Sequence, residues 1–490
     1  MKMKKNKLII IIIFTFLSIT GCSDFFDVND PSNVVSQDEL TGELLLPEIE
    51  YHTAMLYYSE ARYIGMLQQH IASLSNQNID QHYESSMSFV WNRYYSKILL
   101  PLKKMEELAS DNNQLHYLGV AKVLDALNLG LVTDYYGDIP YEEAGLGSEN
   151  LHPNVKSQAE IYALIQNLLN EAIDNLSAND TSGFESVPGD GIYNGDISKW
   201  IRLAYTLKAR YAMHLSKING TQAAQDALTY LDNGFTSNDD DFQLSFNDKN
   251  KNPWYANIIL EQNSAIFYIV FSEQLMNYMN GNSYPTVDID PRLPKYASNG
   301  GDAEWKGAIN GNEGKDVNGD PANTYLSGSG YYFKENSPLV MISYAEAMFL
   351  KAEAEFIVSG GSTTSTGSSQ DAYDAYLSGI EENMNKLGVD SALRDAYLAD
   401  PAIAVSPAGL KLEHIMKEKY IALLLNPEIY TDMRRYNFST DVYKDLELPV
   451  DQNPEMNGRW PGRLLYPTSE VEKNPNIQQV NFWDNVWWDQ

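Results

Sequence analysis

The sequence predicts a mainly α-helical fold in which paired helices form a scaffold and a long loop-rich segment lies against it. Three observations support this prediction. Apolar and alanine residues recur at helical spacing over most of the chain, several such stretches follow one another in adjacent pairs, and the periodicity is lost between Phe235 and Phe333. Small residues at crossing points let paired helices approach closely, as in tetratricopeptide-type hairpins. Because the full repeat consensus is absent, we predict degenerate tetratricopeptide-like hairpins and not a regular solenoid.

The first 38 residues are expected to be a leader and a tether. Four lysines precede an apolar run of roughly a dozen residues, the layout of a signal peptide and shorter than the ~20 residues of a membrane-spanning helix. The run ends in Ile19-Thr20-Gly21-Cys22, and Cys22 is the only cysteine. We predict a signal peptide over residues 1–21, lipid attachment at Cys22 and a tether over residues 22–38. The alternative is an ordinary signal peptide with a chance cysteine.

Composition narrows the class of protein. Apart from Cys22 the chain has no thiol, so an exported body would be held together by its core and not by disulfides. Acyl chains on Cys22 would hold that body at a membrane surface. The formal net charge is -31 at pH 7. Because such a field repels nucleic acid, we expect no nucleic-acid partner.

Residues 39–234 are predicted to form the first part of the helical scaffold. The clearest helix opens with Ser157 and Glu160 at the spacing of a capping box, and an apolar stripe at i, i+3, i+4 and i+7 follows. Another helix is expected over residues 198–217. It is followed after a short link by a helical stretch in residues 221–234, and the two predict a hairpin.

Residues 334–430 are predicted to complete the scaffold with further hairpins. Helices are expected over about 339–358, within 371–388 and over about 410–425. Glu346 and Glu353 lie a heptad apart on the first of these helices. Arg434 and Arg435 can pair with either carboxylate, since guanidinium groups suit carboxylates. The last segment, residues 431–490, is predicted to be irregular and to pack on the scaffold.

Residues 235–333 are predicted to form a loop-rich irregular subdomain and the candidate ligand region. The segment is rich in Asn, Asp, Gly, Tyr and Trp, with one helical element expected near Ser272–Met279. A stretch of this length is uncommon as a mere connection, and surface loops often carry function.

Aromatic residues are in conspicuous excess, with 33 Tyr, 16 Phe and 8 Trp. Their flat faces suit sugar rings and protein partners alike. Trp91 and Trp200 fall within helical apolar patterns, and we interpret both as packing residues. Aromatic residues in polar, loop-like surroundings have less reason to be there. The ligand-binding candidates chosen on this ground are Tyr83, Trp254, Tyr255, Tyr284 and Trp305.

The sequence contains no recognisable catalytic arrangement. H-E-x-x-H and G-x-S-x-G motifs and a phosphate-binding glycine loop are absent, and 66 acidic residues are too many to single out a catalytic pair. Asp316, Asn318 and Asp320 alternate around a turn glycine as calcium ligands do, although position 325 is Tyr and not the glutamate of an EF-hand. They are candidate calcium ligands, with a plain turn as the alternative. Residues 239–241 form a similar acidic cluster, and no other cofactor is expected.

Seven stretches together resemble one family of bacterial proteins. They are LVTDYYGDIPYEEA (131–144), NGDISKWIRLAYTLKARYAMHLSK (194–217), DPRLPKY (290–296), LVMISYAEAMFLKAEAEF (339–356), IMKEKYIALLLNPEIYTDMRR (415–435), GRLLYPTSEVEKNPN (462–476) and VWWD (486–489). These stretches follow, in this order, a leader whose end at Cys22 resembles a bacterial lipobox, the signal for lipid attachment. Together they resemble the SusD/RagB family of Bacteroidetes outer-membrane lipoproteins, particularly its branch ending in Trp-Trp-Asp.

The resemblance implies a binding protein and not an enzyme. Such proteins have a helical scaffold with tetratricopeptide-like hairpins, sit at the cell surface, and cap a SusC-type TonB-dependent barrel to which they deliver glycans or, in some cases, peptides. The resemblance assigns a functional role to Cys22 only, because no glycan-contacting motif of the family can be aligned with this sequence.

The leading hypothesis is a surface-exposed outer-membrane lipoprotein that binds a glycan or oligosaccharide for import. Three alternatives stay open: a peptide-binding import lipoprotein of the same architecture, a surface glycoside hydrolase, and a docking module whose only ligand is its barrel. A glycosidase is disfavoured because the sequence lacks a catalytic signature, whereas loop aromatics and negative charge also suit basic peptides.

Overall fold

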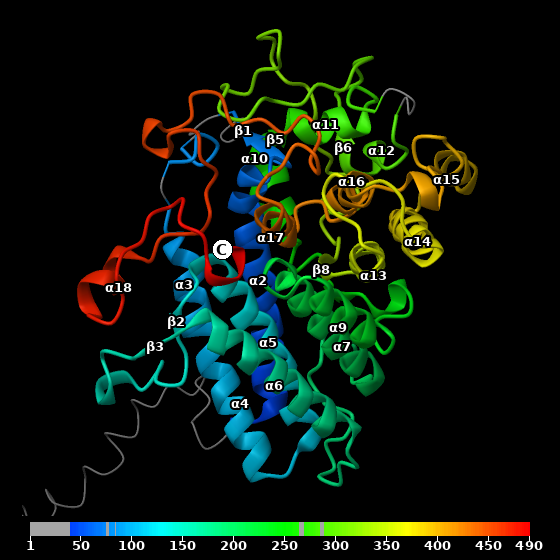
Figure 1. The fold of residues 1–490 in the computed structure, drawn as a ribbon. Coiled ribbons are helices and arrows are strands. Elements are labelled where there is room, and N and C mark those ends of the chain that lie inside the picture. The colour runs from blue at the N-terminus through cyan, green and yellow to red at the C-terminus, as the bar shows by residue number, and fades with distance from the viewer. Residues whose placement is uncertain (1–39, 75–77, 84, 264–268, 285–288) are drawn as a thin grey trace, which may run out of the picture.

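The first half of the chain is a bundle of long helices (Figure 1). The computed structural model describes residues 40–490 except 75–77, 84, 264–268 and 285–288, so the predicted signal peptide, the tether and Cys22 lie outside the described residues. The bundle contains α2 (Gly42–Leu67), α3 (Ser88–Arg93), the π-helical turn η3 (Tyr94–Leu99), α4 (Leu100–Asp111), α5 (Leu115–Tyr136) and α6 (Gln158–Ser177). α5 packs against both α4 and α6.

A second group of helices forms the hairpins. It contains α7 (Ile197–His214), α8 (Ser216–Asn219), α9 (Thr221–Leu231), α13 (Tyr344–Val358), α14 (Gln370–Leu387), α15 (Ser391–Leu398), α16 (Leu412–Ala422) and α17 (Glu428–Arg435). α7 packs on α9, and α13 packs on both α9 and α14. Alanines of α7, α9 and α13 form one buried cluster at their crossing. At the crossing of α13 and α14, a Cβ on Gly379 would come within 2.8 Å of the Phe349 ring, so only glycine fits.

The strongest helix predictions are confirmed. Ser157 and Glu160 form the capping box that opens α6. The helix expected over 198–217 is present as α7 and α8, separated at Leu215. The helix expected over about 410–425 is present as α16. Trp91 and Trp200 are both buried in the core, as predicted.

The prediction of a helix beginning at Leu339 is wrong. Leu339–Ile342 form strand β8, which pairs antiparallel with β4 (Phe242–Leu244), and the helix begins only after Ser343. Ser343 is the N-cap, and its Oγ accepts a hydrogen bond from the backbone N–H of Glu346. The four apolar residues before it fit a strand buried between neighbours, and their partner lies about a hundred residues earlier in the chain.

Short elements make up the upper part of the molecule in Figure 1, which we call the crown (residues 269–284 and 289–333, with 445–450). A four-stranded sheet of order β1-β5-β7-β6 lies within it. The sheet contains β1 (Ile71–Ser73), β5 (Ile269–Phe271), β7 (Tyr325–Leu326) and β6 (Ala297–Ser298). Because β1 comes from the loop after α2, the crown is joined to the helical scaffold by strand pairing. The crown helices are α11 (Glu273–Met279), as predicted near Ser272–Met279, and α12 (Leu293–Tyr296).

Smaller elements complete the chain. They are β2 (Ile139–Pro140), η4 (Gly147–Glu149), β3 (Val155–Lys156), η5 (Asn238–Asp240), η6 (Tyr255–Ile259), α10 (Leu260–Asn263), η7 (Pro407–Gly409), η8 (Pro454–Met456), α18 (Thr468–Lys473) and η9 (Trp487–Asp489). β2 pairs with β3.

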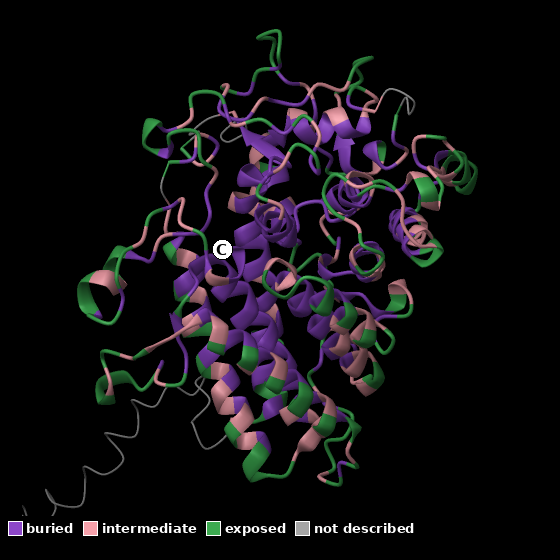
Figure 2. Ribbon diagram, viewed as in Figure 1, coloured by how far each residue is buried: buried purple, intermediate pink, exposed green. Residues whose placement is uncertain are grey.

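Buried residues are concentrated along α2 and α5, and exposed residues lie on the outer loops (Figure 2). Of the helices that the structure describes, α5 alone has the length and composition of a membrane span, with a hydropathy of 1.3 in its most apolar window. Since 78% of that window is buried inside the protein, we assign α5 to the core.

Four cations and four carboxylates form a buried charge cluster between helices. Its members are Arg210 and His214 of α7, Glu346 and Glu353 of α13, Lys419 of α16, and Glu428, Asp432 and Arg435 of α17. Arg210 Nη2 lies 2.6 Å from Glu346 Oε1, and Arg435 Nη1 lies 2.7 Å from Glu353 Oε1. Arg435 therefore pairs with Glu353, one of its two predicted partners. The other predicted partner, Glu346, pairs with Arg210 of α7.

The histidine of the cluster is held in its charged form. Burial lowers the pKa of His214, but the neighbouring carboxylates of Glu428 and Asp134 outweigh burial and raise it to about 9. His214 Nε2 lies 2.5 Å from Glu428 Oε1, and Nδ1 lies 3.2 Å from Asp134 Oδ2. His214 of α7 thus forms buried ion pairs with both α17 and α5.

The chain end packs beside this cluster. The guanidinium of Arg434 lies 4.7 Å from the Trp488 ring centroid and 4.4 Å from that of Tyr430, and the Trp488 indole N–H donates to Asp134 Oδ1 at 2.8 Å. Trp488 is fully buried. The Trp-Trp-Asp ending is therefore part of the core of the scaffold.

Replacing Arg435 by methionine is expected to destabilise the protein strongly. The change leaves the buried carboxylates of Glu353 and Asp432 without a guanidinium partner, and breaking a buried pair costs about 3–5 kcal/mol. Urea unfolding measures the change. Arg394→Met, at a partly exposed arginine paired with the exposed Asp395, is the matched control and is expected to leave the midpoint nearly unchanged. Equal midpoints for both variants would contradict the stabilising role of the cluster.

Candidate functional site

Two neighbouring cavities in the crown form the candidate site. The first has a volume of about 390 Å³ and is lined by Glu273, Asn277, Asn280, Asn282, Ile289, Ala303, Glu304, Trp305, Lys306, Gly307, Asp316, Val317 and Asn318. The second has a volume of about 360 Å³ and is lined by Gln69, Ser272, Glu273, Gln274, Asn277, Asn282, Ser283, Ile309, Asn310, Val317, Asp445, Glu447, Leu448, Pro449 and Val450. Four residues line both cavities, so we treat the two as one continuous crown groove.

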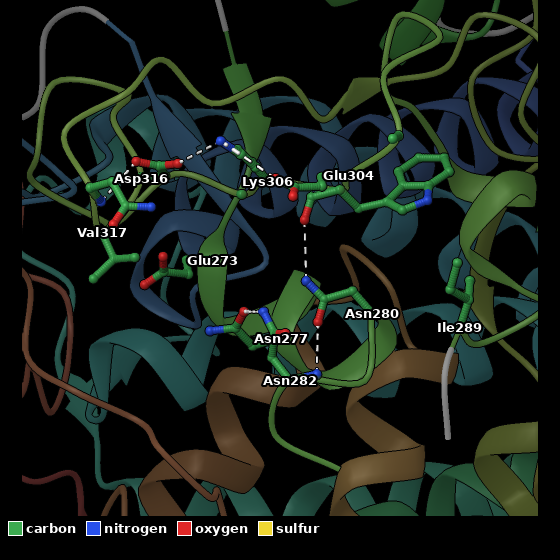
Figure 3. A pocket seen from close by; sticks show the side chains of 13 residues that line it. Glu273, Asn277, Asn280, Asn282, Ile289, Glu304, Lys306, Asp316 and Val317 are labelled. Carbon is green, nitrogen blue, oxygen red and sulfur yellow. Dashed lines mark hydrogen bonds and ion pairs between the residues drawn. The ribbon is translucent and has the colours of Figure 1, made fainter. Parts of the chain in front are cut away.

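Helix α11 supplies one wall of the crown groove (Figure 3). Ser272 is its N-cap and accepts a hydrogen bond from the backbone N–H of Gln274 at 3.3 Å. The same hydroxyl donates to Asn310 Oδ1 at 2.7 Å, which ties the opposite loop to the start of the helix. A Cβ on Gly307 would lie 2.4 Å from the Ser272 carbonyl oxygen, so glycine is required where that loop passes α11.

A row of amides lies along this wall. Asn280 Nδ2 donates to the Trp305 carbonyl at 3.1 Å, and Asn282 Nδ2 donates to Asn277 Oδ1 at 3.0 Å. Within the described part of the chain, Asn277 Nδ2 makes no hydrogen bond of its own. Amide groups carry both donors and acceptors, which matches the hydroxyl groups of a sugar. The groove therefore combines an aromatic ring with polar groups that can fix a ligand's orientation.

A buried carboxyl group connects two loops next to the crown groove. Asp80 is buried and accepts hydrogen bonds from the Ser73 backbone N–H at 2.6 Å and from Asn310 Nδ2 at 2.8 Å. Burial raises the pKa of Asp80 to about 7, although these hydrogen bonds act to lower it. One side chain thus connects the loop after α2 to the loop that carries Asn310.

The structure brings only part of the predicted site together. Trp305 and two of the candidate calcium ligands, Asp316 and Asn318, line the crown groove. Asp316 Oδ1 accepts hydrogen bonds from the backbone N–H groups of Asn318 and Asp320, each at 2.9 Å. Lys306 Nζ lies 3.5 Å from Asp316 Oδ2 and 3.9 Å from Asp320 Oδ2, where a calcium ion would otherwise balance the carboxylates.

The three residues 316, 318 and 320 therefore form a turn closed by its own aspartate. Among the residues that the structure describes, no group of three or more histidine, cysteine, aspartate or glutamate side chains is arranged to hold a metal ion. Calcium binding at this loop stays a prediction.

The other four aromatic candidates do not line the crown groove. Trp254 is only 5% exposed and packs edge-on against Tyr58 and Phe333, and a role as a ligand contact stays a prediction. Its sequence neighbours are polar, but residues distant in sequence pack against the ring. Tyr255 is partly buried beside Lys251.

Tyr284 and Tyr83 lie elsewhere on the crown side. The Tyr284 hydroxyl donates to Glu413 Oε1 at 3.2 Å, and Lys417 and Lys444 lie 4.5 and 5.0 Å from its ring centroid, so its faces are already covered. Tyr83 is 42% exposed and does not line either cavity. Whether it contacts a ligand stays a prediction.

The main residues that sequence reasoning missed are Glu273, Asn277, Asn280 and Asn282. A helical element was expected near Ser272–Met279, and Asn277 lies on it, with Asn280 three residues further on as its C-cap. That spacing is the signal that was available. Asparagine on a short helix, however, is equally typical of a solvated face.

A further cavity of about 420 Å³ lies on the scaffold, lined by Trp91, Asn92, Tyr95, Ser96, Pro140, Ala144, Gly145, Pro153 and Glu470. Trp91 belongs to the core, and the Tyr95 hydroxyl already donates to the Pro140 carbonyl at 2.7 Å. We favour the crown groove because its aromatic and amide groups meet in one continuous space.

The sequence matches the profile of the SusD-like family, described as starch-binding and associating with the outer membrane, over residues 32–467. A search of curated proteins found no match.

Similar solved structures include a chitin-binding protein, with 26% identity, coverage of 92% of this chain and 100% of that chain, and a TM-score of 0.75. A SusD/RagB family protein from Bacteroides thetaiotaomicron has 23% identity, coverage of 92% and 99%, and a TM-score of 0.70. A chitin-binding SusD homologue from Flavobacterium johnsoniae has 20% identity, coverage of 92% and 96%, and a TM-score of 0.67. At their lower identities, the last two show the fold alone. Together the matches confirm the predicted mainly α-helical fold with tetratricopeptide-like hairpins.

The pH dependence of stability is expected to report on Asp80. Its pKa is about 7 in the folded protein and about 4 in an unfolded chain, so between these values the folded state binds more protons. Stability therefore falls as pH rises from about 4 to about 7, by up to ~4 kcal/mol, and levels off above that. Urea unfolding of the protein and of Asp80→Asn across this range measures the effect. If the difference in unfolding free energy between the two proteins is the same at pH 4.5 and pH 7.5, the raised pKa is wrongly assigned to Asp80.

Proposed function

The chain belongs to the SusD-like family, and from this premise we propose that it is a non-catalytic lipoprotein that captures an oligosaccharide in the crown groove. The captured ligand is delivered to a SusC-type TonB-dependent barrel in the same membrane. The family is associated with the outer membrane, and the proposal adds a lipid anchor at Cys22 and an orientation toward the cell exterior.

The observation that carries the proposal is the composition of the crown groove. Trp305 supplies a flat apolar face on which the C–H groups of a sugar ring can stack. Asn277 and Asn282 supply donors and acceptors for its hydroxyls. The joined cavities are large enough for several sugar units, since each falls in the range of small-molecule sites.

The comparisons suggest which glycans to test first. The structure with 26% identity is a chitin-binding protein, and the family description names starch. We therefore propose a neutral or amino-sugar oligosaccharide of glucose units as the ligand class. A peptide ligand would instead need groups in the groove that hydrogen-bond to a peptide backbone.

The proposal treats the groove as non-catalytic. Hydrolysis of a glycosidic bond needs two carboxylates that flank it, one protonated and one free. In the groove, Asp316 is occupied by backbone N–H groups and lies beside Lys306, and Asp445 Oδ2 accepts from the Ser283 hydroxyl at 2.8 Å. These contacts support a fixed polar wall at Asp316 and Asp445, two of the five carboxylates that line the groove.

Delivery requires that the protein and a barrel meet in the outer membrane. The anchor at Cys22 would confine both to one surface and raise their effective concentration. Co-purification of the full-length protein with a large membrane barrel supports this part of the proposal.

Replacing Trp305 by alanine is expected to weaken oligosaccharide binding by about tenfold or more, because the stacking face is lost. Isothermal titration with maltooligosaccharides and acetylated chitooligosaccharides measures the change. Trp483→Ala is the matched control, since Trp483 is also partly buried but lies against Arg459 outside the groove.

Titration should be followed by an assay of the sugar. The proposal expects the oligosaccharide to be recovered intact, whereas reducing ends that accumulate with purified protein would establish a glycosidase. Unchanged binding by Trp305→Ala would place the ligand elsewhere.

Replacing Cys22 by serine is expected to release the protein from the outer membrane. A serine cannot form the thioether that carries the acyl chains, and those chains supply the membrane affinity. Labelled palmitate should enter the wild-type protein and not Cys22→Ser, and the variant should appear in the medium or periplasm. Association with the outer membrane that survives the change would contradict the anchor.

A further inference from the structure

The crown groove carries an excess of negative charge. Its lining contains five carboxylates, from Glu273, Glu304, Asp316, Asp445 and Glu447, and a single cation, Lys306. Lys306 is already paired with carboxylates of the groove, because its Nζ lies 3.6 Å from Glu304 Oε2 and 3.5 Å from Asp316 Oδ2. Its positive charge is therefore not available to a negatively charged ligand.

A neighbouring lysine, Lys444, is also engaged. Lys444 precedes Asp445 in sequence, but its Nζ donates to the Ser283 carbonyl at 2.6 Å and lies 5.0 Å from the Tyr284 ring centroid. Lys444 lines neither cavity. The charge that faces a ligand is therefore negative on both halves of the groove.

Glu273 lies at the centre of this arrangement. It lines both cavities and belongs to the first turn of α11 (Figure 3). Among the described residues, no lysine, arginine or histidine nitrogen lies within ion-pair distance of its carboxylate. Burial raises its pKa, a hydrogen bond from the Val317 N–H lowers it, and the nearby carboxylates of Asp316 and Glu447 raise it further. Glu273 thus lies near two other carboxylates, of which Asp316 is paired with Lys306 and Glu273 itself is not.

A cation bound in the groove would relieve this repulsion. The attraction between an ammonium group and a carboxylate is strongest where water is partly excluded, as it is at a half-buried glutamate. The amides and Trp305 fix a sugar without selecting its charge, whereas the carboxylates distinguish cationic from neutral and anionic sugars. Selection by charge therefore adds to, and does not replace, the recognition of hydroxyl groups.

We propose that the crown groove selects oligosaccharides that carry ammonium groups, that is, deacetylated glucosamine oligomers, over neutral ones and over acidic ones. This inference rests on the proposed function, because it names the ligand class of the same groove. Sugar rings lie over Trp305 and the amide row, and an amino group of the ligand lies against Glu273. Uronic acids and sulfated sugars are repelled by the same carboxylates.

Two oligomers of equal length test the proposal directly, one fully acetylated and one fully deacetylated. Isothermal titration is done at low salt and at a pH where the sugar amines are protonated. The deacetylated oligomer is expected to bind about tenfold more tightly, a difference of about 1.4 kcal/mol. Added salt should weaken the deacetylated oligomer and leave the acetylated one nearly unchanged, since only the first binds through charge.

Variants show whether Glu273 is the source of the preference. Glu273→Gln keeps the shape of the side chain and is expected to reduce the ratio of the two affinities severalfold. Glu472→Gln makes the same change in net charge at an exposed position on α18 and should leave the ratio unchanged. A ratio that falls equally in both variants would attribute the preference to the overall charge of the protein and overturn the proposal.

The outcomes separate the selectivity from the proposed function. If both oligomers bind equally and Trp305→Ala weakens both, the groove binds glycans but the charge preference is wrong. If neither these oligomers nor maltooligosaccharides bind, the proposed function fails. If a lysine-rich peptide of equal charge binds more tightly than the deacetylated oligomer, the ligand class is a basic peptide and the proposal is overturned.

Discussion

The buried charge cluster is the constraint on which the rest of the structure depends. It joins α7, α13, α16 and α17, which are up to about 240 residues apart in sequence, and it places Arg435 and Arg210 against carboxylates of α13. Burying charges is costly unless each finds a partner, so these helices can pack only in the register that pairs them. His214 also carries a positive charge in this cluster, because the carboxylates of Glu428 and Asp134 raise its pKa to about 9.

A scaffold fixed in this way allows the crown to be irregular. The crown loops are held by a few specific contacts, such as Asn310 with Ser272 and Asp80, and by strands that pair with the loop after α2. A ligand entering the groove meets side chains that are already positioned, which lowers the entropic cost of binding. In the proposed function, the amide row, Trp305 and the carboxylates around Glu273 determine what is bound.

Local signals in the sequence predicted the helices well and the crown poorly. The capping box at Ser157 and the apolar stripe behind it fix a helix from neighbouring residues alone. Leu339–Ile342 became a strand because its partner β4 is distant in sequence, and no local pattern reports such a partner. Trp305 was singled out because an aromatic in a polar loop is unusual, and it lines the groove. Trp254 met the same criterion and is buried, since burial depends on which segments fold over the ring.

The central claim is that a rigid helical scaffold presents a crown groove as the place where the ligand is held. Amide hydrogen exchange with and without a saturating oligosaccharide tests it most directly. The account predicts new protection in α11 and residues 302–318, with slow exchange in α7, α13 and α16 that does not change. Protection confined to residues 91–96 and 140–153, or none in the crown under saturation, would contradict it.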